Sequence, residues 1–510
     1  MVLLRTFLLL NTLYLFTLEA FPQSTLVPLF TPITISCDRN YISKDSAFHT
    51  AVKPYLYAEI KNNKLIDSLI GPGLFSANNS FLLLPIVDVQ LGKGTGRSSL
   101  LEYTAGLTLA ARLGKKWSAS ITGLAGNLQL INYLDSFATK KNVIPNFGYA
   151  YRNNNGYSFQ SLSGYVSYSP SKLFNFQVGK DKHFWGDGYR SLFLSDNSNN
   201  FPFIKLSASV WKIKYVSLFA WQKHTSYPAE FIADAKNKFG SFHLLSWNIT
   251  KRININLFEA IVWQGSDTSR SRSFDVNYLN PVIFYRPVEY SIGSSDNALV
   301  GGGFKIKLFK KQQLYSQIML DEFLLKEVLK RSGWWANKYS VQIGYKFFDL
   351  LNINNLYFQA EFNYVRPYTY AHASAQQNYA HFNQALAHPL GANFKEKIGI
   401  ITYTYKRWHF QGRLVTAVYG LDTSAAGYGK NIYISYKNRA QEFGNITTQG
   451  LKTNLNFIQV STTYLLKPAY NMRFEAGIIY RSETNAFQNI SSNLLFIGIK
   501  TSLFNTYRDF

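Results

Sequence analysis

Three long segments of the chain combine aromatic side chains with charged and histidine side chains. Residues 179–200 read GKDKHFWGDGYRSLFLSDNSNN, residues 264–303 contain NPVIFYRPVEYSIGSSDN, and residues 366–394 read RPYTYAHASAQQNYAHFNQALAHPLGANF. Aromatic rings stack on sugar rings, while charged side chains hydrogen-bond hydroxyl groups or pair with uronate carboxylates. These segments therefore predict a surface that binds sugars or anions. The alternative is that they fold inward and plug the protein, held by salt bridges and aromatic packing.

Catalytic and metal chemistry have weaker support in the sequence. The run GKGTGR at 92–97 matches neither the P-loop nor the dinucleotide spacing and predicts a turn. His372, His381 and His388 lack a regular metal-ligand spacing. A hydrolase that uses Ser or Asp with one of these histidines is the enzyme hypothesis. We predict that the chain is not an enzyme and that it uses no metal or cofactor.

The elements between these segments alternate apolar and polar side chains with a period of two, which is typical of β-strands. Four hairpins show this pattern, and they pair 103–113 with 117–121, 162–168 with 174–178, 339–347 with 356–364, and 458–466 with 472–480. A soluble β-sandwich or propeller also alternates, so the flanking sequence has to separate these classes.

The N-terminal residues indicate export. Arg5 precedes an apolar stretch at 7–18 and the small residue Ala20, as in a secretory signal peptide at 1–20. A single membrane anchor is the alternative, but polar residues interrupt the stretch and it is short. Beyond it the longest apolar run, 81–87, is too short for a spanning helix. Because backbone groups in lipid must pair within the protein, a closed barrel is the remaining way to span a membrane.

The expected fold is therefore an all-β transmembrane antiparallel β-barrel of about 16–18 strands with long, partly helical loops. We expect 21–98 to form an N-terminal periplasmic or plug segment that leads into the barrel, and 99–510 to supply the barrel itself. The spacing of apolar residues in 321–331 predicts a short loop helix before Trp334 and Trp335. The alternation at Ile497, Ile499 and Leu503 predicts a closing strand that runs to Phe510, an aromatic end of the kind that outer-membrane assembly machinery reads.

Composition agrees with a barrel in the outer membrane of a Gram-negative bacterium. Aromatic residues make up 16% of the chain, as interfacial girdles require, and the mean hydropathy is −0.12 because half of each strand is polar. The formal net charge of +24 fits lipid, lipopolysaccharide phosphates and acidic surface polysaccharide better than nucleic acid, which an exported barrel rarely meets. Lys305 and Lys307 should face the lumen, and Cys37, the single cysteine, is expected to be an inert thiol.

Several runs resemble one known family. GKDKHFWGDGYRSLFLSDNSNNFPFIKL, NPVIFYRPVEYSIGSSDN, MLDEFLLKE, RPYTYAH and LAHPLGANFKEK together make residues 40–510 similar to the capsule-assembly Wzi family of outer-membrane proteins, and to its Bacteroidota branch with the RemB-type gliding-motility proteins. The resemblance implies an outer-membrane barrel of about 18 strands. It also implies a lectin that attaches capsular polysaccharide to the cell surface.

The resemblance places the expected glycan or anion surface in the long segments. The candidate residues, which carry rings for stacking or charges for pairing, are Lys182, His183, Trp185, Asp187, Tyr189, Arg190, Arg286, Glu289, Arg366, Tyr368, Tyr370, His372 and His388. Three functions stay open at this point: a surface-polysaccharide lectin, a solute channel, and a gliding-motility or adhesion component.

Overall fold

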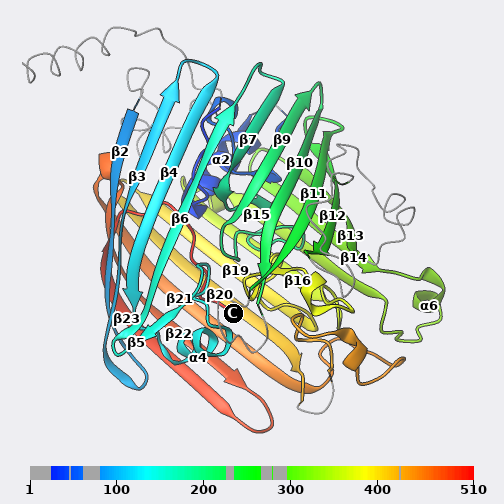
Figure 1. Ribbon diagram of the computed structural model, residues 1–510. Helices are drawn as coiled ribbons and strands as arrows, with labels where there is room; N and C mark the ends of the chain where they lie inside the picture. Colours follow the sequence, from blue (N-terminus) through cyan, green and yellow to red (C-terminus); the bar gives the residue numbers. More distant parts are fainter. Residues whose placement is uncertain are drawn as a thin grey trace, which may run out of the picture.

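Eighteen strands within the described residues close into an antiparallel barrel (Figure 1). The structure is a computed structural model, and it describes residues 24–44, 47–60, 81–225, 235–265, 278, 296–423 and 427–510. The segment 1–20, expected to be a signal peptide, lies outside the described residues, as do Arg286 and Glu289. The predicted all-β transmembrane barrel is confirmed, and its strand number is at the upper end of the expected range.

Each strand of the wall pairs with its neighbours in chain order, and the closure joins the last strand to the first. The strands are β2 (Phe81–Gly94), β3 (Arg97–Leu113), β4 (Trp117–Leu128), β6 (Gly156–Tyr168), β7 (Phe174–Asp181), β9 (Phe201–Val210), β10 (Ile213–His224), β11 (Lys236–Asn248), β12 (Ile253–Gln264), β13 (Asn297–Leu308), β14 (Gln312–Glu322), β15 (Lys338–Phe348), β16 (Leu356–Val365), β19 (Phe394–Tyr405), β20 (Trp408–Leu421), β21 (Leu451–Lys467), β22 (Met472–Thr484) and β23 (Asn489–Lys500).

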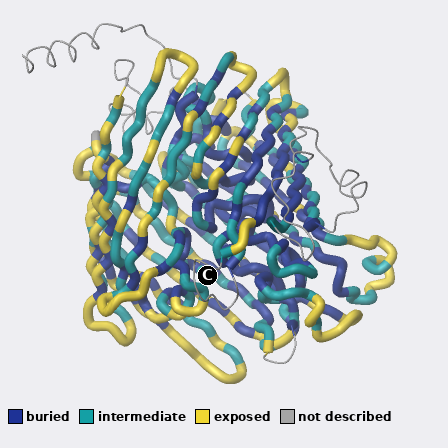
Figure 2. Tube along the Cα trace, in the orientation of Figure 1, coloured by how far each residue is buried: buried dark blue, intermediate teal, exposed yellow. Residues whose placement is uncertain are grey.

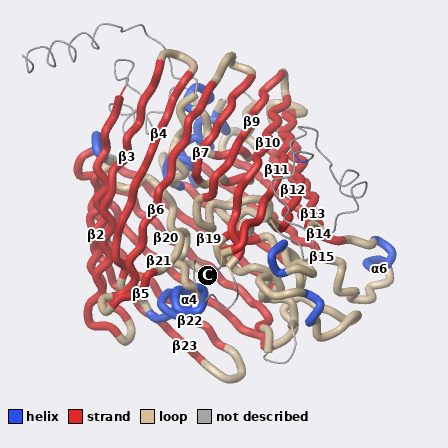
Figure 3. The backbone as a smooth tube through the Cα atoms, viewed as in Figure 1, coloured by secondary structure: helices blue, strands red, loops and turns tan. Residues whose placement is uncertain are grey.

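The remaining elements belong to the N-terminal segment, the loops and the turns. They are α2 (Thr31–Ser43), β1 (Val52–Lys53), η1 (Tyr57–Glu59), α4 (Asn132–Lys141), β5 (Tyr151–Asn153), β8 (Phe184–Trp185), α6 (Leu325–Leu329), η5 (Leu350–Asn352), η6 (Ala375–Gln377), β17 (Ala380–His381), β18 (Gln384–Ala385), η7 (Tyr436–Asn438) and η8 (Pro468–Tyr470). Figure 3 shows how few helices accompany the strands. The helix α6 confirms the short loop helix predicted before Trp334.

The two ends of the barrel differ in the length of their connections. At the upper end in Figure 1, eight described connections join consecutive strands in tight turns, such as Trp211 and Lys212 between β9 and β10. We call this the short-turn end. The opposite, long-loop end carries the connections at 129–155, 182–200, 323–337, 366–393 and 422–450. The predicted hairpins are confirmed, and the structure places Leu113 opposite Trp117 and Tyr345 opposite Ala360.

Period-two alternation sorts the side chains between lipid and lumen, as the alternating exposure along β2 to β4 shows in Figure 2. Leu83, Tyr103 and Leu107 are exposed on the outer face. The prediction that Lys305 and Lys307 face inward is confirmed, because their ammonium groups donate to the carbonyl oxygens of Phe48 (2.8 Å) and Tyr41 (2.7 Å) in the N-terminal segment.

The outer parity of β11 and β12 departs from this pattern. Ser241, His243 and Glu259 belong to the outward-facing set, yet each of these side chains is fully buried. The Ser241 hydroxyl donates to the carbonyl oxygen of Tyr278, and the Tyr278 ring packs on Trp263 with 4.8 Å between centroids. Protein therefore covers this part of the wall.

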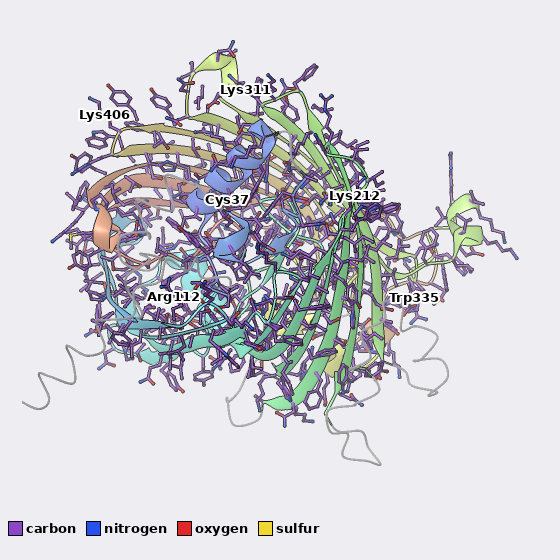
Figure 4. All side chains as sticks on the ribbon, turned by 90° about the horizontal axis from the view of Figure 1, so that it is seen from above. Cys37, Arg112, Lys212, Lys311, Trp335 and Lys406 are labelled. Atoms are coloured by element: carbon purple, nitrogen blue, oxygen red, sulfur yellow. The ribbon has the colours of Figure 1, made fainter. Side chains whose placement is uncertain are left out.

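The lumen between β9 and β16 is filled by the described N-terminal residues 24–44 and 47–60 and by the long loops at 182–200 and 366–393, which together we call the plug. Cys37 of α2 lies inside the barrel when it is viewed from the short-turn end (Figure 4), and it is buried. The strand β1 pairs with β8, so Val52 faces Trp185 in the middle of the plug. No described helix is long and apolar enough to cross a membrane.

The C-terminal residues correct one prediction. The closing strand β23 ends at Lys500, and residues 501–510 turn into the lumen instead of extending the strand to Phe510. The Asp88 carboxylate accepts hydrogen bonds from the backbone N–H groups of Thr501 (2.9 Å) and Ser502 (3.1 Å). These bonds occupy the donors that a longer strand would have used in its ladder, so alternation alone could not locate the strand end.

Candidate functional site

The first predicted segment lies inside the plug. The Trp185 side chain is fully buried, and the His183 ring meets the Phe203 ring edge-on with 4.5 Å between centroids. The Lys182 ammonium donates to the carbonyl oxygens of Asn146 (2.6 Å) and Asp196 (3.1 Å), and burial lowers the pKa of this lysine to about 8. These three side chains therefore hold the segment in place.

Asp187 and the residues that follow it are also buried. The Thr50 hydroxyl donates to the Asp187 carboxylate. Burial opposes ionisation of Asp187, but the positive charges of Lys305 and Lys53 lower its pKa. The carboxylate thus anchors the N-terminal segment and the first long loop to the barrel wall.

Arg190 lies in a cluster of buried charges that we call the ionic core, formed by Arg190, Glu361, Glu396, Arg413 and Asp509. The Arg190 guanidinium forms ion pairs with Asp509 (3.1 Å) and Glu396 (3.4 Å), while Arg413 pairs with Asp509 at 2.8 Å. The Glu361 carboxylate accepts the backbone N–H groups of residues 189 and 190 at 2.7 and 3.1 Å. The ionic core therefore joins a loop, the barrel wall and the C-terminal residues.

Tyr189 and His388 complete the contacts of the ionic core. The Tyr189 hydroxyl donates to Asp509 at 2.7 Å. His388 Nδ1 accepts the backbone N–H of Leu390 (3.1 Å), so the ring proton sits on Nε2, which donates to Glu396 at 2.6 Å. Burial lowers the pKa of His388, in agreement with a neutral ring.

The third predicted segment, 366–394, begins at the long-loop end and descends into the plug. The Tyr370 hydroxyl donates to the Leu192 carbonyl at 2.9 Å, and its backbone N–H donates to Asp321 at 2.8 Å. The His372 ring is mostly buried, and burial lowers its pKa to about 4. Among the described residues no group of three His, Cys, Asp or Glu side chains could hold a metal ion.

Beside the plug the lumen contains a chamber of about 680 Å³ between α2, the C-terminal residues and the wall formed by β2, β3 and β19 to β23. Asn355, Lys406 and Arg407, which lie in the short turns, belong to its lining. Deeper in the barrel the lining carries the ion pairs Arg508–Glu102 and Lys500–Glu475, the latter 2.8 Å long. The chamber therefore lies next to the short-turn end and has a mixed apolar and polar lining, in which part of the charge is paired internally.

At the long-loop end, aromatic rings and charges meet in a partly exposed group that we call the tryptophan cluster. Its members come from the loops at 323–337, 366–393 and 422–450, and they are Trp334, Trp335, Arg366, Tyr368, Tyr436, Arg439 and Glu442. The Arg439 guanidinium lies 4.4 Å from the centre of the Trp335 ring. The Trp335 indole N–H donates to Glu442 at 2.8 Å, and the Glu442 side chain is 46% exposed.

Backbone hydrogen bonds fix the three loops of the tryptophan cluster relative to each other. The N–H of Trp335 donates to the Glu442 carbonyl (2.9 Å), and the N–H of Asn445 donates to the Gly333 carbonyl (2.9 Å). The N–H of Tyr368 donates to the Gly429 carbonyl (3.0 Å). Rings and charges are thus held in a preformed arrangement, which lowers the entropic cost of binding a ligand.

The structure separates the predicted site residues into two groups. Arg366 and Tyr368 belong to the tryptophan cluster, where the Arg366 guanidinium donates to the Trp334 and Asn445 carbonyls at 3.4 Å. The other described candidates lie within the plug, and they are Lys182, His183, Trp185, Asp187, Tyr189, Arg190, Tyr370, His372 and His388. Sequence reasoning noted Trp334 and Trp335 but did not include them among the candidate site residues, and it missed Tyr436, Arg439 and Glu442. Their only local signal is the three-residue spacing of Arg439 and Glu442, which is common in surface loops.

The fold resembles that of solved outer-membrane proteins. The structure of Wzi, described as an outer membrane protein involved in group 1 capsule assembly in Escherichia coli and a carbohydrate-binding β-barrel, matches 94% of this chain and 100% of its own with a TM-score of 0.59 and 13% identity. OprD of Pseudomonas aeruginosa matches 82% of this chain and 94% of its own with a TM-score of 0.43 and 10% identity. At 13% identity the likeness to Wzi shows the barrel fold alone.

Another solved structure, Pseudomonas aeruginosa OpdK with vanillate, matches 82% of this chain and 97% of its own, with a TM-score of 0.45 and 8% identity. No family model matches the chain, and no curated protein matches it.

Proposed function

We propose that this chain is an outer-membrane barrel that binds acidic surface polysaccharide through the tryptophan cluster at its long-loop end. The observation that carries the proposal is the union of Trp334, Trp335 and Tyr436 with the charges of Arg366, Arg439 and Glu442 on loops that are hydrogen-bonded together. Rings supply stacking faces for pyranoses. Guanidinium groups supply paired donors for uronate carboxylates.

The placement of the cluster supports the proposal. Single-chain outer-membrane barrels keep short turns in the periplasm and long loops outside the cell. In this orientation the tryptophan cluster faces the capsule or its equivalent, while α2 lies at the periplasmic end. The likeness to Wzi, described as a carbohydrate-binding barrel, agrees with this use of the fold. The suggested kinship with RemB-type gliding-motility proteins stays a proposal from the sequence.

The test is binding of polygalacturonate and of neutral dextran to the purified full-length protein in detergent. We expect polygalacturonate to bind with an affinity that falls as salt rises, and dextran to bind more weakly. The double substitution Trp334→Ala with Arg366→Gln should weaken polygalacturonate binding about tenfold or more, since stacking and charge pairing are both lost.

The matched control is Trp211→Ala with Arg252→Gln, which removes the same residue types from exposed positions at the short-turn end. This control should bind polygalacturonate as the unmodified protein does. Equal loss in both double variants, or equal binding of the acidic and neutral polymers, would contradict the proposal. Heat-dependent gel mobility shows whether each variant still forms a folded barrel.

A further inference from the structure

The short-turn end carries a nearly continuous ring of positive charge. Lysine or arginine lies in six of the eight described short connections, and Lys467 adjoins a seventh as the last residue of β21. The members of this basic ring are Lys115, Lys116, Lys172, Lys212, Lys251, Arg252, Lys310, Lys311, Lys406, Arg407 and Lys467. Lys212, Lys311 and Lys406 mark separate positions around the rim in Figure 4.

Negative charge is scarce at this rim. The only carboxylate in the eight described short connections is Asp349, and it already pairs with Arg39 of α2 at 3.5 Å. The long-loop end differs, because some of its cations pair with carboxylates of the same loops, as in Lys330–Glu327 and Arg439–Glu442. The positive charge of the basic ring therefore lacks an equivalent set of carboxylates at the same end.

Large apolar side chains stand beside these cations at the tips of the turns. Trp211 and Phe309 are each 80% exposed, and Leu351 is 76% exposed. The ammonium of Lys212 lies 5.2 Å from the centre of the Trp211 ring, and that of Lys406 lies 5.3 Å from the centre of the Tyr405 ring. Such tips would be unfavourable in water, but they match a bilayer interface, where rings enter the headgroup layer and long cationic side chains reach phosphates.

We propose that the basic ring binds the anionic phospholipids of the periplasmic leaflet, with phosphatidylglycerol as the preferred headgroup class. The partner follows from three features: cations at nearly every turn, apolar tips beside them, and a distribution around the whole circumference. A protein partner would contact one sector of the rim, whereas lipid surrounds it completely. The inference rests on the orientation in the outer membrane given above, and it is independent of polysaccharide binding.

The test is native mass spectrometry of the full-length protein released from micelles that contain equimolar phosphatidylglycerol and phosphatidylethanolamine. We expect severalfold more phosphatidylglycerol than phosphatidylethanolamine on the unmodified protein. In the variant Lys116→Gln, Lys212→Gln, Lys310→Gln and Lys406→Gln, this ratio should fall about fivefold, because each cation near an anionic lipid surface adds to its attraction.

The matched control replaces four exposed cations of the long-loop end, with the substitutions Lys326→Gln, Lys330→Gln, Arg331→Gln and Lys437→Gln. It should keep the lipid ratio of the unmodified protein. An equal loss in both variants, or no lipid preference in the unmodified protein, would overturn the proposal. Inorganic phosphate at the lipid concentration should leave the ratio unchanged, and displacement of the lipid by phosphate would show a simple anion site instead.

A second measurement places the lipid at the rim. The difference in fluorescence between the unmodified protein and Trp211→Phe is the component that Trp211 emits. Brominated phosphatidylglycerol in mixed vesicles should quench this component. Brominated phosphatidylethanolamine should quench that component less. Equal quenching by the two lipids would contradict a headgroup preference at this turn even if the variants fold and insert normally.

Discussion

Asp509 shows how single residues set the shape of the lumen. Its carboxylate accepts the Tyr189 hydroxyl and pairs with Arg190 and Arg413, and its side chain is fully buried. Burial opposes ionisation, but the two guanidinium groups hold the pKa of Asp509 well below its usual range. A carboxyl group with a lowered pKa stabilises the folded state fully above its unfolded pKa, and this contribution is lost progressively as pH falls from the unfolded pKa through the folded one, while the folded carboxyl itself stays ionised until its own pKa is reached. The ionic core should therefore persist throughout the neutral and mildly acidic range.

Replacing Asp509 by Asn should destabilise the protein by about 3 kcal/mol, because two buried guanidinium groups lose their shared counter-charge. The expected observation is a lower temperature for the shift between folded and unfolded bands on a gel, with faster proteolysis of residues 501–510. Asp349→Asn is the control, since its partly exposed pair with Arg39 contributes less than about 1 kcal/mol. Equal stability of both variants would mean that the ionic core does not anchor the C-terminal residues.

At the scale of elements, the sequence predicted what depends on local pattern. Strand pairs such as those around Leu113 and Trp117 follow from alternation and a tight turn, so their register was accessible. The burial of Trp185 and the meeting of Trp335 with Glu442 depend on contacts between residues far apart in the chain. One sequence contains no signal for such contacts, so a binding surface and inward-folded plugging loops both stayed open for these segments, and most of the described candidates lie within the plug.

Gly333 is a position at which two loops of the tryptophan cluster approach each other closely. Its φ is +66°, and a Cβ there would lie 2.7 Å from the Asn445 nitrogen and 2.8 Å from the Gly444 carbonyl carbon. Gly333→Ala should therefore separate the two loops. We expect polygalacturonate binding to weaken about tenfold, which is the size of effect that follows from losing one central contact of a binding site. Gly114→Ala is the control, since its φ is +63° but nothing lies within 4 Å of the added Cβ. If the two variants bind equally well, loop docking does not position the site.

At the scale of the molecule, the two ends of the barrel have different surfaces, and between them the lumen holds the plug on one side and the chamber on the other. The long-loop end carries paired charges and the tryptophan cluster, and the short-turn end carries the basic ring. The plug joins these ends through Asp38 of α2, which pairs with Lys346 of the wall at 2.6 Å, and through the ionic core. This arrangement favours a rigid surface-binding barrel over a channel, because many contacts would have to break before solutes could pass.

If the protein were a channel, it would conduct ions steadily in planar bilayers. The unmodified protein should show no steady single-channel conductance, because the plug fills the lumen between β9 and β16 and the chamber is bounded by α2 and the C-terminal residues. Replacing residues 183–199 by a short Gly-Ser linker removes Trp185, Arg190 and their contacts, so it should produce conductance while heat-dependent gel mobility still shows a folded barrel. Insertion is verified for both proteins by protease protection in vesicles. The unmodified protein could instead conduct as steadily as the loop-deleted variant. This result would show that the plug does not close the lumen, and a channel would then replace the proposed function.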